Sequence, residues 1–348
     1  MKNFKEGPRL KICHAPMEIA GQVGLINTKL REEGFISAAF NYFQTSFDYP
    51  GTYPTDSYDM QKVALAAISY FDIFHFHNSG TFIGDFRDLK WIKEQGGKVI
   101  MHHRGTDVRT RVLAKKGDDY ENQYVNAESS LPDDMIQDNL ITFAQSIDAA
   151  IVQDYELYKY VKPYYEKTGV PVYVLPRLCN VNDYIPRYSD VNQSRPLVVH
   201  APSQREFKGT SAIEEAIMEL KNEIEFDFQL IENTSHKEAT RLYQNADVII
   251  DQILCGMYGN LSVEAMALGK PVIAYIRPDL LSTLPPDLPI QSANPDTIKP
   301  ILKELLIDSG RRHALGLQGR KYVELHHNSS AVINKLTTIY QSVYKGND

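Results

Sequence analysis

Residues 251–272 read Asp-Gln-Ile-Leu-Cys-Gly-Met-Tyr-Gly-Asn-Leu-Ser-Val-Glu-Ala-Met-Ala-Leu-Gly-Lys-Pro-Val, and they hold a strand end, a loop, a helix and the start of another strand. The apolar run Asp247–Ile250 leads into this stretch, and the pattern that follows predicts a short helix over Asn260–Leu268. Gly269 suits the residue after the helix, where a left-handed backbone is common, and Pro271 stops the helix. Two buried strands joined by a helix form the repeating unit of a parallel sheet.

The same alternation of strand and helix patterns extends over most of the chain. In the second half, strands are predicted at Leu197–His200, Phe226–Ile231, Asp247–Ile250 and Pro271–Ile276. In the first half, they are predicted at Leu10–His14, Ile73–His77, Lys98–His103, Ala149–Gln153 and Val172–Leu175, with helices near Gly24–Gly34 and Gly84–Glu94. Because these strands are apolar on both faces, we predict an α/β fold with parallel sheets covered by helices.

A polar segment bounded by prolines, Pro186–Pro196, interrupts the alternation and is interpreted as an interdomain linker. It divides the chain into a Rossmann-like N-terminal domain, residues 1–186, and a Rossmann-like C-terminal domain, residues 187–328. Residues 329–348 hold a long helical pattern, and packing back on the N-terminal domain is one arrangement open to it. Two such domains predict a cleft between them, with ligands at the carboxyl ends of the strands.

The composition excludes several classes of protein. The 348 residues carry 37 Lys and Arg against 44 Asp and Glu, a net charge of −7, which argues against general binding of nucleic acid. The three cysteines form no CxxC motif, so neither a disulfide framework nor a structural zinc site is expected. No apolar run approaches the roughly 20 residues of a membrane span, and the N-terminus lacks a signal-peptide core. A cytoplasmic protein is predicted.

A candidate anion site follows the strand Leu197–His200. Arg205 and Lys208 lie in a predicted loop, together with Ser203, directly before a helix that starts near Ser211. Two cations beside the positive end of a helix suit a diphosphate. Considered alone, the two charges could equally be solvated loop residues.

A second candidate anion site lies in the loop before the helix Asn260–Leu268. Gly256 and Gly259 let the backbone approach a ligand closely, and the N–H groups of residues 259–262 are expected to point towards an anion. Glu264 lies one turn into the helix, where it could accept hydrogen bonds from a ribose diol. Its alternative role is to complement the helix dipole.

These residues give the chain a resemblance to a known family. Lys208-Gly209-Thr210 followed by Glu264-Ala-Met-Ala-Leu-Gly-Lys-Pro-Val272 resembles the retaining, GT-B-fold glycosyltransferases of glycosyltransferase family 4, also called glycosyl transferases group 1. Met101–Arg109 resembles the histidine-containing loop of that family, Val174–Asn180 the segment before its linker, and Ala20–Gly24 its glycine-rich loop. The resemblance covers nearly the whole chain and implies two Rossmann-like domains whose parallel sheets face each other across a cleft.

The resemblance also implies roles for individual residues. His103, Arg205 and Lys208 become the catalytic residues, with His103 facing the donor sugar and phosphate. The donor-binding residues become Gly21, Ser203, Gly256, Tyr258, Gly259, Asn260, Leu261 and Glu264. The chain departs from the family at Gly256, which stands where the family has the first of two glutamates, and in the short spacing between Arg205 and Lys208.

The activity implied is transfer of a sugar from a UDP- or GDP-sugar to a hydroxyl of a sugar, glycolipid or polysaccharide acceptor, with retention, in cell-envelope synthesis. No DxD motif is found, so metal independence and no cofactor are expected. Two alternatives remain: a nucleotide-sugar 2-epimerase of the same fold, and a non-catalytic nucleotide-sugar-binding protein, which the departure at Gly256 motivates.

Basic, aromatic and histidine residues add further expectations. Arg104, Arg109, Arg111, Lys115 and Lys116 form either a basic patch for a lipid phosphate at the inner face of a membrane or a solvated segment. The aromatic stretch Phe40–Tyr58 forms either an acceptor platform or a pinned loop. His75 and His77 are expected on one face of their strand and His102 and His103 on opposite faces; His236, His313, His326 and His327 are expected at the surface. The histidines have no spacing typical of a zinc site.

Overall fold

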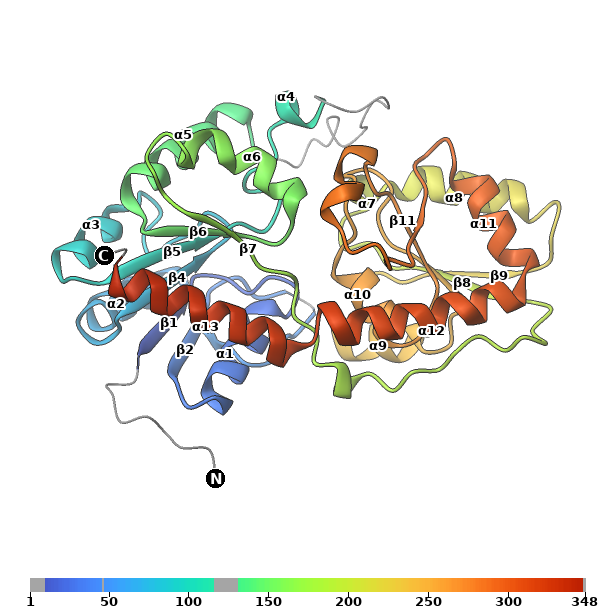
Figure 1. The fold of residues 1–348 in the computed structure, drawn as a ribbon, viewed down its shortest axis with the longest axis horizontal. Coiled ribbons are helices and arrows are strands. Elements are labelled where there is room, and N and C mark those ends of the chain that lie inside the picture. The colour runs from blue at the N-terminus through green and yellow to red at the C-terminus, as the bar shows by residue number, and fades with distance from the viewer. Residues whose placement is uncertain (1–9, 46, 116–130, 347–348) are drawn as a thin grey trace.

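The structure is a computed structural model that describes residues 10–45, 47–115 and 131–346, and within them the chain forms two halves that lie side by side (Figure 1). The strands of the first half are β1 (Lys11–Ala15), β2 (Ile36–Asn41), β3 (Tyr53–Pro54), β4 (Ile73–His77), β5 (Lys98–His102), β6 (Ala149–Val152) and β7 (Val172–Val174). Its helices are α1 (Gln22–Glu32), α2 (Ser57–Tyr70), α3 (Arg87–Glu94), α4 (Arg111–Ala114), α5 (Asp133–Ser146) and α6 (Tyr155–Tyr165).

The first half is built on a seven-stranded parallel sheet in the order β3-β2-β1-β4-β5-β6-β7. Every residue of β4, Ile73–His77, is buried, because helices cover both faces of the sheet. Alternate residues point to opposite faces, so Phe74 and Phe76 pack with α2, α3, α5 and α6, whereas Ile73 packs with α1 and the C-terminal helix.

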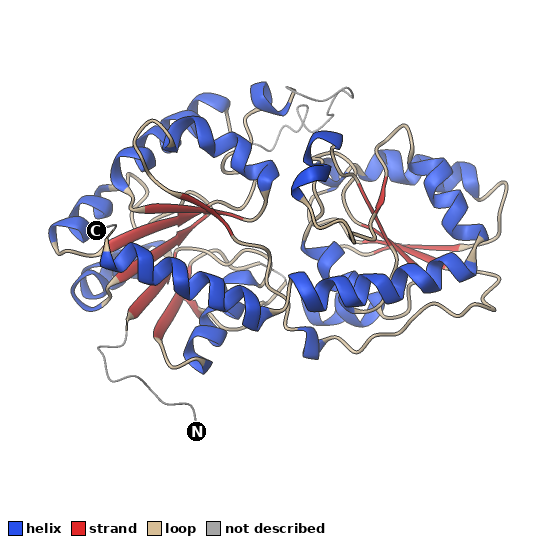
Figure 2. Cartoon of the chain, viewed as in Figure 1, coloured by secondary structure: helices blue, strands red, loops and turns tan. Residues whose placement is uncertain are grey.

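The second half is a five-stranded parallel sheet in the order β12-β11-β10-β8-β9. Its strands are β8 (Leu197–His200), β9 (Asp227–Leu230), β10 (Val248–Ile250), β11 (Val272–Ala274) and β12 (Gln291–Ser292). Its helices are α7 (Arg205–Lys208), α8 (Thr210–Leu220), α9 (His236–Tyr243), α10 (Asn260–Ala267), α11 (Ile298–Ile307), α12 (Ser309–His326) and the 3-10 helix η3 (Pro278–Thr283). The mixed α/β architecture with two parallel sheets confirms the predicted fold class, and helices flank both sheets (Figure 2).

Two connections join the halves. The segment after β7 contains the 3-10 helix η2 (Val181–Asp183), and Pro186–Pro196 has no regular strand or helix. The chain returns through α12, which lies along the second half, into α13 (Ser329–Lys345), which lies along the first (Figure 1). Where the two connections meet, the N–H of Cys179 donates to His327 O and the N–H of Ser329 to Cys179 O, both at 2.8–2.9 Å. Leu336 and Tyr340 of α13 are fully buried against the first sheet.

Local details differ from the sequence predictions at several points, and strands β2, β3 and β12 were not predicted. Arg205 and Lys208 lie in the one-turn helix α7 rather than in a loop, and α3 begins at Arg87 rather than near Gly84. Gly269 has φ +73° directly after α10, as predicted for a helix stop. Among the described residues, no helix combines the length and apolarity that crossing a bilayer requires.

Candidate functional site

A cavity of about 930 Å³ lies between the two halves, where the carboxyl ends of β1 and β4 face those of β8 and β10. Both pairs of strands mark the point at which the strand order of their sheet reverses, the usual place for a ligand in such folds. From the first half the lining includes Met17, Glu18, Tyr42, Phe43, Phe47, Tyr49, Asn78, Thr106 and Asp107. From the second half it includes Ser203, Gln204, Lys208, Glu232, His236, Asn260, Leu261 and Glu264.

Lys208 is the cation of α7 that reaches this cavity. Its Nζ lies 2.8 Å from Asp251 Oδ1 and 2.8 Å from Gln252 Oε1, and its side chain is 14% exposed. Burial acts to raise the pKa of Asp251, but Lys208 and the hydrogen bonds donated to the carboxylate outweigh it and hold that pKa below its usual value. Lys208 is therefore held by an ionised carboxylate and fixed in place at the cavity wall.

The amino end of α10 is capped from inside the protein. The N–H groups of Gly259 and Ser262 donate to Asp251 Oδ2 at 2.8 and 3.3 Å, and the Ser262 hydroxyl donates to the same oxygen at 2.7 Å. The expectation that these N–H groups point towards a ligand is therefore corrected, because a buried carboxylate already occupies them. Asn260 and Leu261, between the two, do line the cavity.

Arg205 lies outside the lining of this cavity. Its guanidinium pairs with Glu214 at 2.6 Å and with Glu232 at 3.0 Å, and its side chain is 45% exposed. Only Glu232 of this trio reaches the cavity wall. Both cations were expected at the site. The structure instead encloses Lys208 at the cavity wall, whereas Arg205 forms ion pairs with two carboxylates at the surface.

Glu264 lines the cavity one turn into α10, as the sequence indicates, but it has a partner that the sequence did not suggest. His236 Nε2 lies 2.8 Å from Glu264 Oε1. The ring of Tyr49, from the first half, packs against His236 with the ring centres 5.0 Å apart. Burial favours the neutral ring, but the bond and the charge of Glu264 outweigh it and raise the pKa of His236. His236 is therefore a site residue, not the surface group that was expected.

Gly256 and Tyr258 face away from the cavity, contrary to the roles implied by the resemblance. Gly256 has φ +82°, and a Cβ at this position would lie 2.0 Å from Arg277 Cγ, so no side chain fits here. Tyr258 is buried in the second half, where its hydroxyl lies 3.1 Å from His327 Nε2. His327 is itself 2% exposed, which corrects its expected place at the surface.

His103 is enclosed rather than facing the cavity. Its Nδ1 lies 2.7 Å from Asp107 Oδ2, its Nε2 lies 2.7 Å from the hydroxyl of Tyr165, and its exposure is 0%. Asp107 does line the cavity, so His103 can act on a ligand only through that carboxylate. Gly21 caps α1 with φ +73° and borders a second cavity of about 640 Å³, which shares Tyr49, His236 and Glu264 with the first.

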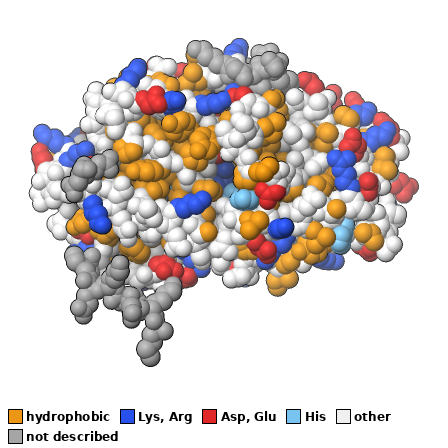
Figure 3. All heavy atoms as spheres, in the orientation of Figure 1, with side chains coloured by type: hydrophobic (Ala, Val, Ile, Leu, Met, Phe, Trp, Pro, Cys, Tyr) orange, Lys and Arg blue, Asp and Glu red, His pale blue; other side chains and the backbone are white. Residues whose placement is uncertain are grey.

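The residues of the expected basic patch do not form one surface: Lys115 is exposed and Arg111 partly exposed, whereas the other two described members are buried. Arg104 and Arg109 are each 8% exposed, and Arg109 forms a bidentate ion pair with the fully buried Glu156. Lys116 lies outside the described residues. On the face shown in Figure 3, charged side chains of both signs are scattered among apolar ones. The aromatic stretch does reach the cavity, through Tyr42, Phe43, Phe47 and Tyr49.

Four histidines stack under α13 at the carboxyl ends of β1, β4 and β5. His14 Nδ1 lies 3.2 Å from His77 Nε2, and His75 Nε2 lies 3.2 Å from His102 Nδ1. All four are at most 1% exposed, and the hydroxyl of Tyr340 on α13 lies 2.6 Å from His75 Nδ1. His75 and His77 share a face, and His102 and His103 lie on opposite sides of β5, as the strand period predicts.

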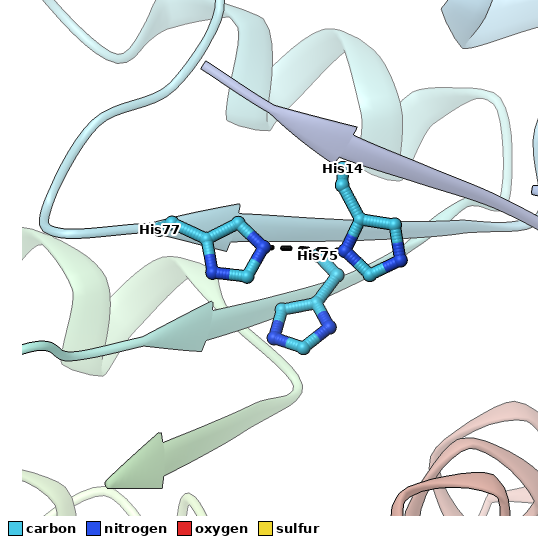
Figure 4. Close-up of side chains that lie close together, drawn as sticks. All are labelled: His14, His75 and His77. Atoms are coloured by element: carbon cyan, nitrogen blue, oxygen red, sulfur yellow. Dashed lines mark hydrogen bonds between the residues drawn. The ribbon is translucent and has the colours of Figure 1, made fainter. Parts of the chain in front are cut away.

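Three of these rings, His14, His75 and His77, come close enough to be tested as a metal site (Figure 4), since one nitrogen of each lies within 4.8 Å of the others. However, the Arg104 guanidinium lies 3.1 Å from His77 Nδ1. A guanidinium can only donate, so His77 Nδ1 accepts and Nε2 carries the ring proton. His77 Nε2 then donates to His14 Nδ1 and offers no lone pair to a metal. The cluster fits a directed chain of hydrogen bonds rather than a metal ion.

The buried histidines predict a loss of stability on acidification. Burial, aided by Arg104, lowers the pKa of His14 from 6.5 to about 3, and burial likewise holds the pKa values of His75, His77 and His102 well below 6.5. At a pH between the lowered pKa values of the buried rings and the ordinary value of 6.5, the unfolded chain binds more protons than the folded one. The free energy of unfolding therefore falls as the pH drops below about 6.5. Each proton taken up contributes a slope of up to ~1.4 kcal/mol per pH unit.

Urea unfolding at a series of pH values between 7.5 and 5 measures this dependence. The substitution His14→Asn keeps an acceptor near the position of Nδ1 and removes one titrating ring, so it should make the pH dependence shallower. A midpoint that is constant over this range would contradict the burial of neutral rings.

Two of the residues gathered here were missed from the sequence. Asp251 was noted only as the end of a strand, although an acidic residue just after an apolar strand, at the edge where ligands bind, is a usable signal. His236 offered the weaker signal of a histidine after Ser235, a residue that caps the start of α9.

No family model matches this chain, and no curated protein matches it in sequence. Solved structures do resemble it. Sucrose-phosphate synthase from Thermosynechococcus elongatus has a TM-score of 0.69 at 14% identity, covering 97% of this chain and 100% of that one. A glycosyltransferase from Rickettsia africae ESF-5 has a TM-score of 0.67 at 14% identity, covering 98% and 100%. Anabaena HepE, solved with UDP-glucose, has a TM-score of 0.59 at 11% identity, covering 96% and 100%.

These likenesses extend over nearly the whole chain and so include both halves. At such low identity they show the fold alone. The chain has the GT-B fold: two Rossmann-like domains with parallel sheets that face each other across a cleft.

Proposed function

We propose that this protein is a glycosyltransferase that moves a sugar from a nucleotide-sugar donor to a hydroxyl acceptor. The observation that carries the proposal is that Lys208 and Glu264 line one interdomain cavity, with Asn260 and Leu261 at the start of α10 beside them. A cation and a helix start suit a diphosphate, and a carboxylate suits the hydroxyls of a ribose. The similar fold of HepE, whose structure holds UDP-glucose, supports this reading.

The donor diphosphate is placed at Lys208. When the sugar leaves, negative charge grows on the diphosphate and positive charge grows at the anomeric carbon. A cation already fixed by Asp251 and Gln252 stabilises that leaving group without reorganising, which is the main source of electrostatic catalysis. Of the cations that the sequence suggested, Lys208 is the one enclosed at the cavity wall, and Arg205 contributes from farther away.

The acceptor is placed on the side of the first half. There the cavity wall carries Asn78, Thr106 and Asp107, which can bind hydroxyls, and the rings of Tyr42 and Phe43, on which a sugar face can stack. We propose retention of configuration, with the departing phosphate taking the acceptor proton, so that no protein nucleophile is required. Membership of glycosyltransferase family 4, independence of metals and a role in cell-envelope synthesis belong to the same proposal.

Binding and transfer assays test the function directly. A thermal-shift screen against UDP-, GDP- and ADP-sugars identifies the donor, and product analysis with simple sugar and glycolipid acceptors then detects transfer. Formation of an epimer of the donor without acceptor would indicate the 2-epimerase instead. Nucleotide-sugar binding with no product in either assay would favour the non-catalytic alternative.

The substitution Glu264→Gln is expected to weaken nucleotide binding by about tenfold or more, because hydrogen bonds to a charged group contribute roughly 1.5–3 kcal/mol. Titration calorimetry measures the affinity, and circular dichroism checks that the fold persists. Glu238→Gln is the matched control, since Glu238 is an exposed residue of α9 that pairs with Arg241. Equal affinities in the wild type and Glu264→Gln would remove Glu264 from the site.

A further inference from the structure

His236 occupies an unusual position at the interface of the two halves. It is the first residue of α9, which the side chain of Ser235 caps by accepting from the N–H of Glu238. The backbone N–H of His236 donates across the cleft to Phe47 O at 3.1 Å. With the ring of Tyr49 packed against its imidazole, His236 is held by its own helix and by a loop of the other domain.

The bond from His236 to Glu264 joins two helices of the second half, α9 and α10. The side chains are 27% and 16% exposed, so the pair is largely shielded from water yet remains at the cavity wall. His236 Nε2 lies against Glu264 Oε1, and Tyr184 also hydrogen-bonds to this carboxylate. A carboxylate has about four lone-pair sites, so Glu264 can still accept from a ligand. A glutamate side chain without such a bond loses more rotamer entropy when a ligand fixes it.

We propose that His236 is a positioning residue that holds Glu264 in the orientation in which its carboxylate accepts from the ribose hydroxyls of the donor nucleotide. The inference rests on the proposed function, since it assigns a nucleotide to the cavity. It goes further in making ribose selection a property of the His236–Glu264 pair. A carboxylate that is already oriented before binding favours a ribose whose hydroxyls can donate to it. A sugar that lacks one of these hydroxyls leaves the carboxylate without that hydrogen bond and binds more weakly.

The surroundings of the pair predict its response to pH. Besides Glu264 on α10, the groups near His236 are Tyr49 from the first half, Lys237 and Tyr243 of α9, and Tyr184, which follows η2. Burial, with a smaller contribution from the charge of Glu264, raises the pKa values of both Tyr184 and Tyr243, so these tyrosines stay neutral. As the pH rises above the elevated pKa of His236, the imidazolium loses its charge and its bond to Glu264 weakens.

Nucleotide binding to four variants tests the proposal. Calorimetry with UDP, 2′-deoxy-UDP and 3′-deoxy-UDP is carried out on the wild type, His236→Ala, Glu264→Gln and the double variant, with GDP and ADP tested in parallel. The wild type should prefer UDP to at least one deoxy analogue by about tenfold or more. Each single variant should lose most of that preference, and the double variant should lose no more than either single one.

A rescue and a remote control separate positioning from general support of the fold. In His236→Gln the amide nitrogen lies near the position of Nε2, so this variant should keep most of the preference, and its UDP affinity should lose the pH dependence of the wild type. His313→Ala should leave the preference unchanged. His313 lies on α12, where its Nδ1 contacts the backbone oxygen of Ser189, and it does not line the cavity.

Three results would overturn the proposal in distinguishable ways. If Glu264→Gln loses the preference while His236→Ala keeps it, Glu264 binds ribose without help from His236. If the wild type binds UDP, 2′-deoxy-UDP and 3′-deoxy-UDP equally well, the His236–Glu264 pair does not recognise the ribose hydroxyls, although a nucleotide still binds. If UDP, GDP and ADP all fail to bind, the proposed function fails and this inference with it.

Discussion

Lys208→Ala is expected to lower the turnover rate of sugar transfer by about a hundredfold or more. Removing one preorganised donor to the charge of a transition state typically costs this much, and Lys208 is the enclosed cation at the cavity wall. The rate constant at saturating donor and acceptor is the quantity to measure. A larger effect on this rate than on donor affinity is expected, since the leaving-group charge grows only as the bond breaks.

Arg205→Ala provides the matched comparison. The sequence alone placed both cations in one candidate anion site, but Arg205 must leave Glu214 and Glu232 before it can reach a phosphate. We therefore expect a loss below about tenfold in this variant, since exposed and paired charges contribute little. Turnover of Lys208→Ala within a few-fold of the wild type, in a correctly folded protein, would exclude Lys208 from the catalytic step.

Asp251→Asn is expected to reduce the free energy of unfolding by about 3–5 kcal/mol, the usual cost of removing one partner from a buried ion pair. Asp251 is fully buried and accepts from Lys208, from the N–H of Gly259 and from the backbone and side chain of Ser262. The amide has the same shape but no charge, so Lys208 loses its counterion and the start of α10 loses its anionic cap. Urea unfolding at neutral pH measures the loss.

Asp227→Asn is the control for this substitution. Asp227 pairs with Arg195 at the surface, where both side chains are more than half exposed, so its loss should change stability little. An unfolding midpoint of Asp251→Asn equal to that of the wild type would show that the carboxylate does not anchor α7 and α10.

Most of the strands, though not β2, β3 or β12, followed from the sequence because the signals for them are local. The run Ile73–His77 is apolar apart from two histidines and forms β4 with the predicted bounds. The helix predicted over Asn260–Leu268 is α10, ending one residue earlier, and Gly269 and Pro271 stop it as expected. Periodicity, helix caps and stop residues act within a few positions of the chain, so a single sequence contains them.

The sequence motifs did not reveal which side chains of the candidate site point into the cavity. Tyr258 and Gly256 lie in the stretch that resembles a known family, yet one packs into the core of the second half and the other abuts Arg277. Two arginines of the expected basic patch, Arg104 and Arg109, were also misplaced: Arg109 is buried against Glu156, which lies 47 positions along the chain. A charge far away in sequence decides whether such a side chain can be buried, and no local pattern reveals it.

By itself, the sequence determined the α/β fold class with parallel sheets, and it predicted the sheet edges at which we propose that a ligand binds. Only the tertiary structure decided which side chains reach the cavity and with which partners. Lys208 meets Asp251 across 43 positions and His236 meets Glu264 across 28, and both pairs are brought together by crossover connections between strands. Secondary structure depends on neighbours along the chain, whereas the partners of a charged group depend on which elements the fold brings beside it.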